Sequence, residues 1–280
     1  MNTVENALCY VLHSKPFKDT SAIVELLSQE HGRVSVIFKG VRSTKNSAKS
    51  RVLQPFQPLL ASWYGKRELK SGKSVEQGGM PHMLSGKKLY SGIYLNEILL
   101  RMLHRDAPAE GIYEHYQQCL SELQGKGENK GATATTKSVG ASSENIEVHL
   151  RQFEWRLLDA IGYQLPCECD AQSGAPIVVD AYYRYEINHG FIYDSPISSE
   201  NFAPRSGVFS GELLLAILRD MTVYAHHPRQ QQQQYHDNLS RHLLPEAKRL
   251  MRLALAPHLG EKPLESKKLF MGISKYESSQ

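Results

Sequence analysis

Lysine and arginine side chains gather in one stretch of the chain that contains no acid. Residues 31–67 include neither Asp nor Glu. A solvated surface normally mixes both signs of charge, so this exclusion indicates a polyanionic partner, and the phosphate backbone of a nucleic acid is the commonest one. The alternative is an ordinary solvated face with a mobile, Lys-rich loop. The predicted DNA-binding residues are the cations of this stretch: Arg33, Lys39, Arg42, Lys45, Lys49, Arg51, Lys66 and Arg67.

A metal site is the second chemistry that the residue types suggest. Cys167 and Cys169 stand in the string CECD. A structural zinc ion needs four nitrogen or sulfur ligands; His189 is a possible third, and the sequence offers no fourth. We therefore predict a turn without metal, and no cofactor.

Catalysis finds little support in the sequence. The chain has 12 histidines, yet it contains no GxSxG, HExxH, P-loop or GxGxxG motif and no carboxylate pair at a plausible separation. We predict that the protein is not an enzyme and has no catalytic residues. A metal-dependent hydrolase, the rival from this class, would need the ligand set that is missing here.

A second binding site is suggested by an arginine-rich, apolar segment. Arg151 and Arg156 are interleaved with Phe153, Trp155 and Leu157. A cation at the rim of an apolar groove can hold an acidic peptide that ends in an aromatic ring. The alternative is a core helix with solvated arginines. The predicted peptide-binding residues are Arg151, Phe153, Arg156 and Leu157.

The N-terminal elements that would position the cations read as short strands. Apolar runs and alternation predict strands in residues 7–12, 21–28, 34–38, 52–63 and 65–73. Pro16 should end the first of them. Phe38 fits core packing, whereas Trp63 could pack or stack on a base. Five strands within about 80 residues suit a small barrel of the OB-fold type, which binds oligonucleotides; we assign it residues 1–82.

From residue 85 the hydrophobic period becomes helical, so the fold class is α+β with a mainly α-helical domain in residues 83–280. Gly162 and Ser210 are the expected caps of two helices, and Asn188-His189-Gly190 reads as a hairpin turn. Residues 125–147 have almost no large apolar side chain and are predicted to be a disordered insertion; a Gln run at 230–234 reads as a linker. The expected helices cover 89–103, 112–120, 146–161, 210–225 and 239–256, and the expected hairpin joins 182–187 to 191–193.

Charge and composition bound the class of protein. The net charge of the 280 residues is +4, but residues 1–82 carry twelve Lys or Arg against six acids. That asymmetry indicates a basic N-terminal module. We found neither a signal peptide nor a long apolar window, and the 4 cysteines are too few for a disulfide framework. The expected setting is soluble, reducing and cytoplasmic, with no membrane partner.

Several strings of the sequence resemble one family over nearly the whole chain. The N-terminal strings are VLHSKPFKDTSAIVELLSQEHGRVSVIFKGVR and LQPFQPLL, and the central ones are LYSGIYLNEILLRML, LRQFEWRLLDAIGY and YRYEINHGFI. The last is AKRLMRLALAPHLGEKPLESKKLF. Any one string is weak, but together they resemble RecO, the bacterial recombination mediators.

The resemblance implies an OB-fold, a helical domain and a small zinc-finger-like region, which would fall in residues 163–208. Some members hold zinc there with four cysteines; this chain keeps two, so it looks like the metal-free branch. The resemblance further implies binding of single- and double-stranded DNA, strand annealing, and action in the nucleoid with RecR to load RecA. It also implies binding of the acidic tail of single-stranded-DNA-binding protein, with Arg151 as the contact that best matches. The competing interpretation is an OB-fold RNA-binding protein.

Overall fold

The computed structural model describes residues 3–43, 47–125, 141–197, 205–226 and 239–269. The chain forms two compact units. Unit 1 comprises Met1–Val139 and Leu259–Gln280, and unit 2 comprises Gly140–His258. Unit 1 is thus built from two separate stretches of sequence.

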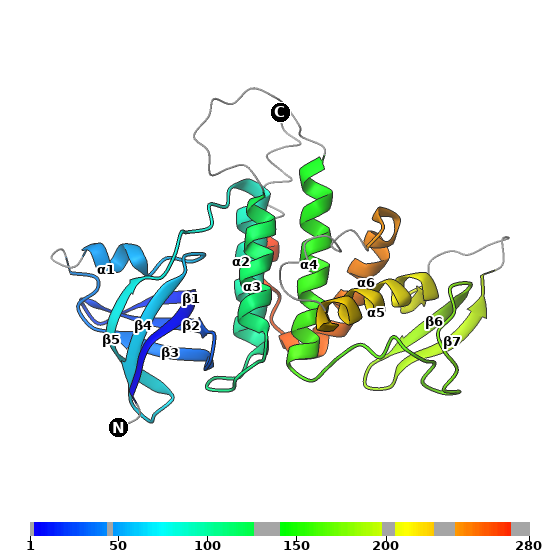
Figure 1. The fold of residues 1–280 in the computed structure, drawn as a ribbon, viewed down its shortest axis with the longest axis horizontal. Helices are drawn as coiled ribbons and strands as arrows, with labels where there is room; N and C mark the ends of the chain where they lie inside the picture. Colours follow the sequence, from blue (N-terminus) through cyan, green and yellow to red (C-terminus); the bar gives the residue numbers. More distant parts are fainter. Residues whose placement is uncertain (1–2, 44–46, 126–140, 198–204, 227–238, 270–280) are drawn as a thin grey trace. The chain divides into compact units, whose positions relative to one another are not determined.

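The first part of unit 1 is a closed five-stranded barrel (Figure 1). Its strands are β1 (Thr3–Phe17), β2 (Ser21–Ser28), β3 (Gly32–Phe38), β4 (Leu59–Tyr64) and β5 (Leu69–Gln77). They follow the order β1-β2-β3-β5-β4, and β1 also pairs with β4 to close the barrel. β3 and β5 are parallel, and the short helix α1 (Ser47–Val52) lies between β3 and β4 in the chain. The predicted OB-like barrel is confirmed, although α1 and the later start of β4 were not predicted.

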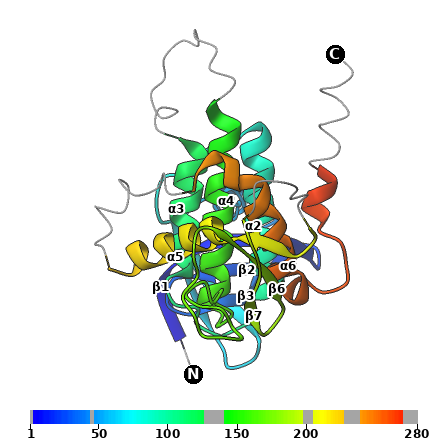
Figure 2. The same ribbon diagram turned by 90° about the vertical axis from the view of Figure 1, so that its right-hand side faces the viewer.

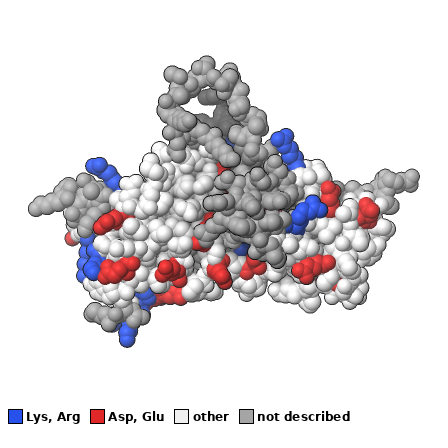
Figure 3. Space-filling model, in the orientation of Figure 1, with Lys and Arg blue, Asp and Glu red and all other residues white. Residues whose placement is uncertain are grey.

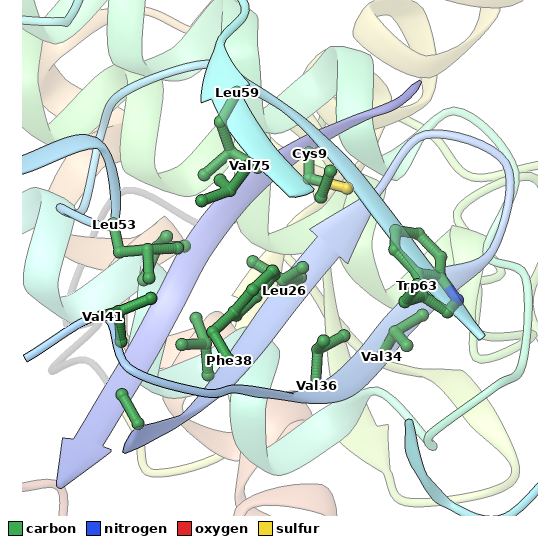
Figure 4. Close-up of a cluster of buried hydrophobic side chains, with 14 residues drawn as sticks. Cys9, Leu26, Val34, Val36, Phe38, Val41, Leu53, Leu59, Trp63 and Val75 are labelled. Carbon is green, nitrogen blue, oxygen red and sulfur yellow. The ribbon is translucent and has the colours of Figure 1, made fainter. Parts of the chain in front are cut away.

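The barrel is held together by inward-facing apolar side chains from all five strands. Figure 4 shows this cluster, in which Leu26, Val36, Phe38 and Trp63 are among the buried members. Phe38 is 3% exposed and Trp63 only 2%. Phe38 packs in the core as predicted, and Trp63 belongs there too, so neither ring is available to stack on a base.

Strand β1 is longer than the sequence suggested, because it continues through Pro16 to Phe17. Pro16 pairs with Ala22 of β2. On its other side the partner strand β4 reaches only to Cys9, so the missing N–H of the proline is not needed there. The prediction that Pro16 ends the strand was therefore wrong, and the turn lies at 18–20.

Two helices of unit 1, α2 (Gly86–Met102) and α3 (Ile112–Gln124), lie side by side next to the barrel (Figure 1). Tyr10 of β1 packs its ring against those of Tyr113 and Tyr116, with centroids 5.3 and 5.1 Å away. Asn96 donates to the Leu12 carbonyl at 3.1 Å and accepts from the Tyr116 hydroxyl at 2.5 Å. Buried aromatic and amide contacts therefore join barrel and helices.

The end of the described chain returns to α2. The Glu97 carboxylate accepts from the backbone N–H groups of Glu265 and Ser266 at 2.9 and 2.8 Å. Arg101 donates to the carbonyls of Leu259, Lys262 and Pro263. One acid and one arginine on neighbouring turns thus hold residues 259–266 against unit 1.

Unit 2 contains three helices and a small sheet. Helix α4 (Ala141–Ala160) is followed by β6 (Ala181–Glu186) and β7 (Gly190–Pro196), and then β8 (Val208–Ser210), α5 (Gly211–His226) and α6 (Leu244–Leu259), whose last residue is already in unit 1. The sheet order is β7-β6-β8, and Figure 2 views the unit from the side of the β6–β7 hairpin. The predicted hairpin is confirmed, as is Ser210 as a cap, since its hydroxyl accepts from the Leu213 N–H at 3.3 Å.

The predicted boundaries of the barrel domain and of the insertion differ in part from those of the observed units and helices. The barrel ends within residues 1–82, but the compact unit that contains it also includes α2 and α3. Helix α4 begins at Ala141, inside the predicted insertion 125–147, because a helix can extend beyond its apolar face on backbone hydrogen bonds alone. The rest of that insertion and the Gln run lie almost wholly outside the described residues. Among the residues described, no helix could cross a membrane.

Candidate nucleic-acid interface

Arg33, the first cation of the acid-free stretch, is used inside unit 1. Its side chain is 14% exposed and its Nε donates to Glu25 at 2.8 Å. Its Nη1 donates to the carbonyls of Leu100 and Leu103 at the end of α2. This guanidinium already neutralises an acid and caps a helix, so the structure does not support Arg33 as a phosphate contact.

Glu25 is the acid that the sequence window did not include. It stands opposite Ser35 in the β2–β3 pairing and accepts from the Ser35 hydroxyl at 2.6 Å. Arg105 donates to it at 2.9 Å. Burial acts to raise the pKa of Glu25, but the hydrogen bonds from Ser35, Arg105 and Arg33 together lower it below its usual value. The carboxylate therefore stays ionised between two arginines.

The loop that carries Arg105 pairs with the edge of β3 at this point, where Arg105 forms a parallel bridge with Arg33. Asp106 donates its N–H to the Arg33 carbonyl at 2.8 Å, and its carboxylate pairs with Lys70 at 2.9 Å. Gly32 approaches so closely that a Cβ there would lie 2.1 Å from the Ala107 carbonyl oxygen. The Arg105 side chain, bonded to Glu25, thus occupies part of the β2–β3 face that OB-folds use for oligonucleotides.

Four other cations are exposed at the end of the barrel formed by the β1–β2 turn. Arg42 donates its backbone N–H to Thr20 at 2.8 Å and its Nη1 to the Lys18 carbonyl at 3.4 Å, which fixes the loop after β3 beside the turn. Lys39 follows Phe38, the residue paired with Ala22. We call Lys15, Lys18, Lys39 and Arg42 the turn cluster; all four are exposed and form no ion pair within the part of the chain described.

Lys66 and Arg67, the hairpin pair, are exposed in the β4–β5 turn. Thr3 pairs with Tyr64 at this end of β1, whereas Phe17 pairs with Ser21 at the other. Arg51 is exposed on α1, while Lys45 and the side chain of Lys49 lie outside the described residues. The predicted cations therefore form at least two groups, and Figure 3 shows blue side chains at more than one place along the outer edge of the barrel.

Lys15 and Lys18 were not among the predicted contacts. Asp19 follows Lys18 directly, and Glu25 and Glu30 lie between the turn and the acid-free stretch. The usable signal was a hairpin between the expected strands at 7–12 and 21–28. Its turn carries Lys18 and lies beside Arg42, which donates to Lys18 and Thr20.

The predicted peptide site lies in a buried part of α4. Phe153 and Leu157 are almost fully buried, and the Arg151 and Arg156 side chains are 10% and 8% exposed. Arg151 donates to Glu154 at 2.6 Å, and Arg156 donates to both oxygens of Asp220 at 3.2 and 3.0 Å. Among the residues described, these four residues therefore do not form an open peptide groove. The peptide-groove hypothesis had expected the arginines at the rim of a groove, and the core-helix alternative had expected them in solvent; the structure buries them instead.

Asp220 collects three donors at the centre of this region. Gln152 donates to its Oδ1 at 3.0 Å, and the Trp155 indole N–H donates to its Oδ2 at 2.9 Å, alongside Arg156. Every residue from 150 to 158 is buried, so α4 has no solvent-facing side here. A polar face can be buried in this way only when its charges are paired.

The two cysteines of the CECD string are placed differently. Cys167 is buried and Cys169 exposed, and burial raises the pKa of the Cys167 thiol. Asp170 organises the turn by accepting from the N–H groups of Gln172, Ser173 and Tyr193. In the ranges that the structure describes, no three His, Cys, Asp or Glu side chains come together as metal ligands.

Comparison with known proteins identifies the family. Residues 1–78 match the model of the recombination protein O N-terminal domain. A DNA repair protein RecO of Coxiella burnetii is 37% identical over 260 residues, which is 93% of this chain and 95% of the relative. The chain belongs to the RecO family. The Haemophilus influenzae and Pseudomonas paraeruginosa RecO proteins are 36% and 37% identical, and each match covers 93% or more of both chains.

Family membership and the barrel together give a coarse function. The RecO relatives carry the name DNA repair protein, and the OB-like barrel is a fold that serves nucleic-acid binding. This RecO-family chain is accordingly a DNA repair and recombination protein.

Proposed function

We propose that the protein binds DNA phosphates through the two exposed turns of its barrel. The observation that carries this is the contrast in cation use: Arg33, Lys70 and Arg105 are paired with acids, whereas the turn cluster and the hairpin pair are exposed and, within the described chain, form no ion pairs. OB-folds use the loops after strands 1 and 4 for oligonucleotides. Here these loops carry Lys18, Lys66 and Arg67, and Arg42, in the loop after β3, lies beside the first of them.

The test is the salt dependence of DNA binding. Each lost phosphate contact reduces the slope of log K against log salt by roughly 0.7–0.9. We expect the double variant Lys39→Ala/Arg42→Ala to weaken binding of all sequences and to flatten the slope by up to about two. The matched control is Lys248→Ala/Arg252→Ala, which removes two exposed cations of α6. An unchanged slope in the first variant would remove the turn cluster from the interface.

We further propose that the protein anneals complementary strands and helps RecA to load on DNA coated with single-stranded-DNA-binding protein, acting with RecR. Membership of the RecO family supports this, and so does the charge of the barrel, because pairing two strands requires their phosphate repulsion to be screened. We propose the acidic tail of single-stranded-DNA-binding protein as a partner, but at a site other than Arg151, Phe153, Arg156 and Leu157.

Annealing of coated strands tests this finer assignment. We expect the protein to anneal strands covered by intact single-stranded-DNA-binding protein and to lose this activity when that protein lacks its last residues, while bare strands still anneal. Equal activity on both coated substrates would contradict the tail as a partner. Tighter binding of an RNA strand of the same sequence would favour an RNA-binding function instead.

A further inference from the structure

A small pocket of about 270 Å³ lies within unit 2, and all of its lining residues belong to that unit. Three elements build it: the end of α4, the β6–β7 turn and the end of α6. Sites for drug-sized ligands typically have volumes of about 300–1,000 Å³, and this pocket is slightly smaller. It therefore suits a single ring system.

The chain just after α4 places the exposed ring of Tyr163 in the wall of this pocket. Gly162, at φ 83°, donates its N–H to Asp159, and Tyr163 donates its N–H back to Leu158 at 2.8 Å. This is the Schellman arrangement that ends a helix. It places Tyr163, 53% exposed, against His258 of α6 with ring centroids 4.1 Å apart.

The opposite wall is the turn Asn188-His189-Gly190. Asn188 has φ 67° and Gly190 φ 105°, and a Cβ at Gly190 would lie 2.7 Å from Pro166 Cγ, so the turn sits tightly on the chain after α4. The His189 Nδ1 lies 3.3 Å from the Ile187 carbonyl. Because a carbonyl can only accept, Nδ1 donates, and Nε2 of the neutral ring is left as an acceptor.

The chemistry of the lining selects the ligand. Two tyrosines and two histidines supply aromatic surface, while the Gln164 and Asn188 amides supply donors and acceptors. None of the described residues that line the pocket is Asp, Glu, Lys or Arg. Burial also lowers the pKa of His258, which keeps its imidazole neutral near pH 7. Such a site favours an uncharged, flat group with polar edges.

We propose that this pocket binds one unpaired nucleobase of a DNA strand, stacked on Tyr163. The proposal rests on the DNA-binding function proposed above, which supplies strands with exposed bases. A base in a duplex hides both its faces and its pairing edge, so the pocket would contact only single-stranded DNA.

The test compares an oligo-dT strand with an abasic strand of equal length, using the full chain. Stacking of one base is worth enough to change affinity about tenfold. We expect Tyr163→Ala to weaken binding of oligo-dT about tenfold and of the abasic strand less than twofold, with the salt slope unchanged. Tyr163→Phe should bind oligo-dT as the natural chain does. Tyr193→Ala, which removes a tyrosine 49% exposed elsewhere in unit 2, is the matched control.

Equal effects of Tyr163→Ala on the two strands, or no effect on either, would overturn the proposal. Titration with free thymidine, followed by the NMR signals of Tyr163 and His258, separates it from the barrel interface. Shifts of these signals support the pocket even if the Lys39→Ala/Arg42→Ala variant leaves the salt slope unchanged. Shifts caused by N-acetyl-tyrosinamide and not by thymidine would instead assign the pocket to a peptide side chain and contradict our proposal.

Discussion

Asp220 shows how much of unit 2 depends on one carboxylate. It accepts from Gln152, Trp155 and Arg156, all on α4 and all buried. Pairing in a buried site only offsets the cost of removing both charges from water. The network therefore contributes little net stability when it is intact, but it becomes costly when one member is removed.

Replacing Asp220 by Ala should lower the free energy of unfolding by about 3–5 kcal/mol, because it leaves the Arg156 guanidinium buried without its carboxylate. Denaturant unfolding followed by circular dichroism measures this. Asp159→Ala is the control, since that acid is exposed on the same helix as Arg156. A loss no larger than that of the control would show that Arg156 finds water or another acceptor.

Glu25 gives a prediction about pH. Its pKa in the folded protein is lowered, so the ionised carboxylate stabilises the fold above the usual pKa of about 4.5, and this stability is lost as the pH falls through the folded value. Glu25→Gln should therefore cost about 2 kcal/mol at pH 7, and the difference from the natural chain should shrink towards pH 3.

Unfolding curves at pH 7 and pH 3 test the Glu25 prediction. Glu76→Gln, an exposed acid on β5, serves as the control. A difference that stays constant from pH 7 to pH 3 would mean that the charge of Glu25 is not what stabilises the fold.

The same residues show what the charge pattern could and could not predict. The absence of acids from residues 31–67 is a fact of sequence, but charges pair in space. Arg33 donates to Glu25 across the β2–β3 pairing, and Arg105, which is 80 residues from Glu25 in the sequence, donates to the same carboxylate. Local charge counts predict a basic module correctly, yet they do not reveal which of its cations remain exposed.

At the scale of elements, periodicity predicted most strands and helices. The alternation of apolar and polar residues does not predict a strand end correctly where pairing with a neighbouring strand sets the chain conformation. β1, which continues through Pro16, is such a case. Periodicity also fails at α4, where a helical stripe predicted one buried side but Arg151, Glu154 and Arg156 are buried as well. Burial of charged side chains depends on partners such as Asp220 that lie on another helix.

At the scale of elements, Gly32 is a position that leaves no room for even one methyl group. It begins β3 at φ 63°, where a side chain is strained, and the Ala107 carbonyl occupies the place of its Cβ. We expect Gly32→Ala to lower the free energy of unfolding by about 2–5 kcal/mol. The loop 104–108 should exchange its amide hydrogens faster.

Gly86→Ala is the matched comparison for Gly32→Ala. Gly86 has φ 53° but nothing within 4 Å of its would-be Cβ, so only backbone strain remains, about 1–2 kcal/mol. Equal losses in the two variants would mean that the loop moves away from Gly32 without cost.

At the scale of the whole molecule, unit 1 depends on residues that follow unit 2 in the chain. Glu97 and Arg101 of α2 take their partners from residues 259–266. A chain that stops at residue 258 should therefore keep unit 2 folded but weaken unit 1. Its thermal midpoint should fall by about 5–10 °C for a loss of a few kcal/mol.

Hydrogen exchange locates the effect of this truncation. Protection should fall in α2 and β1 and stay unchanged in α5, while a chain that stops at residue 269 should behave like the full chain. Loss of protection confined to unit 2 would contradict the dependence of unit 1 on the returning segment.

The discontinuity of unit 1 also has a consequence for the order in which the protein is made. The barrel, α2 and α3 leave the ribosome first, but the segment that completes them comes after the 119 residues of unit 2, Gly140–His258. At about 5–20 residues per second this delay is roughly 6–24 s. During that interval Glu97 and Arg101 lack their partners from 259–266, so the nascent chain carries an incomplete unit 1 whose last segment can dock only after all of unit 2 has been made.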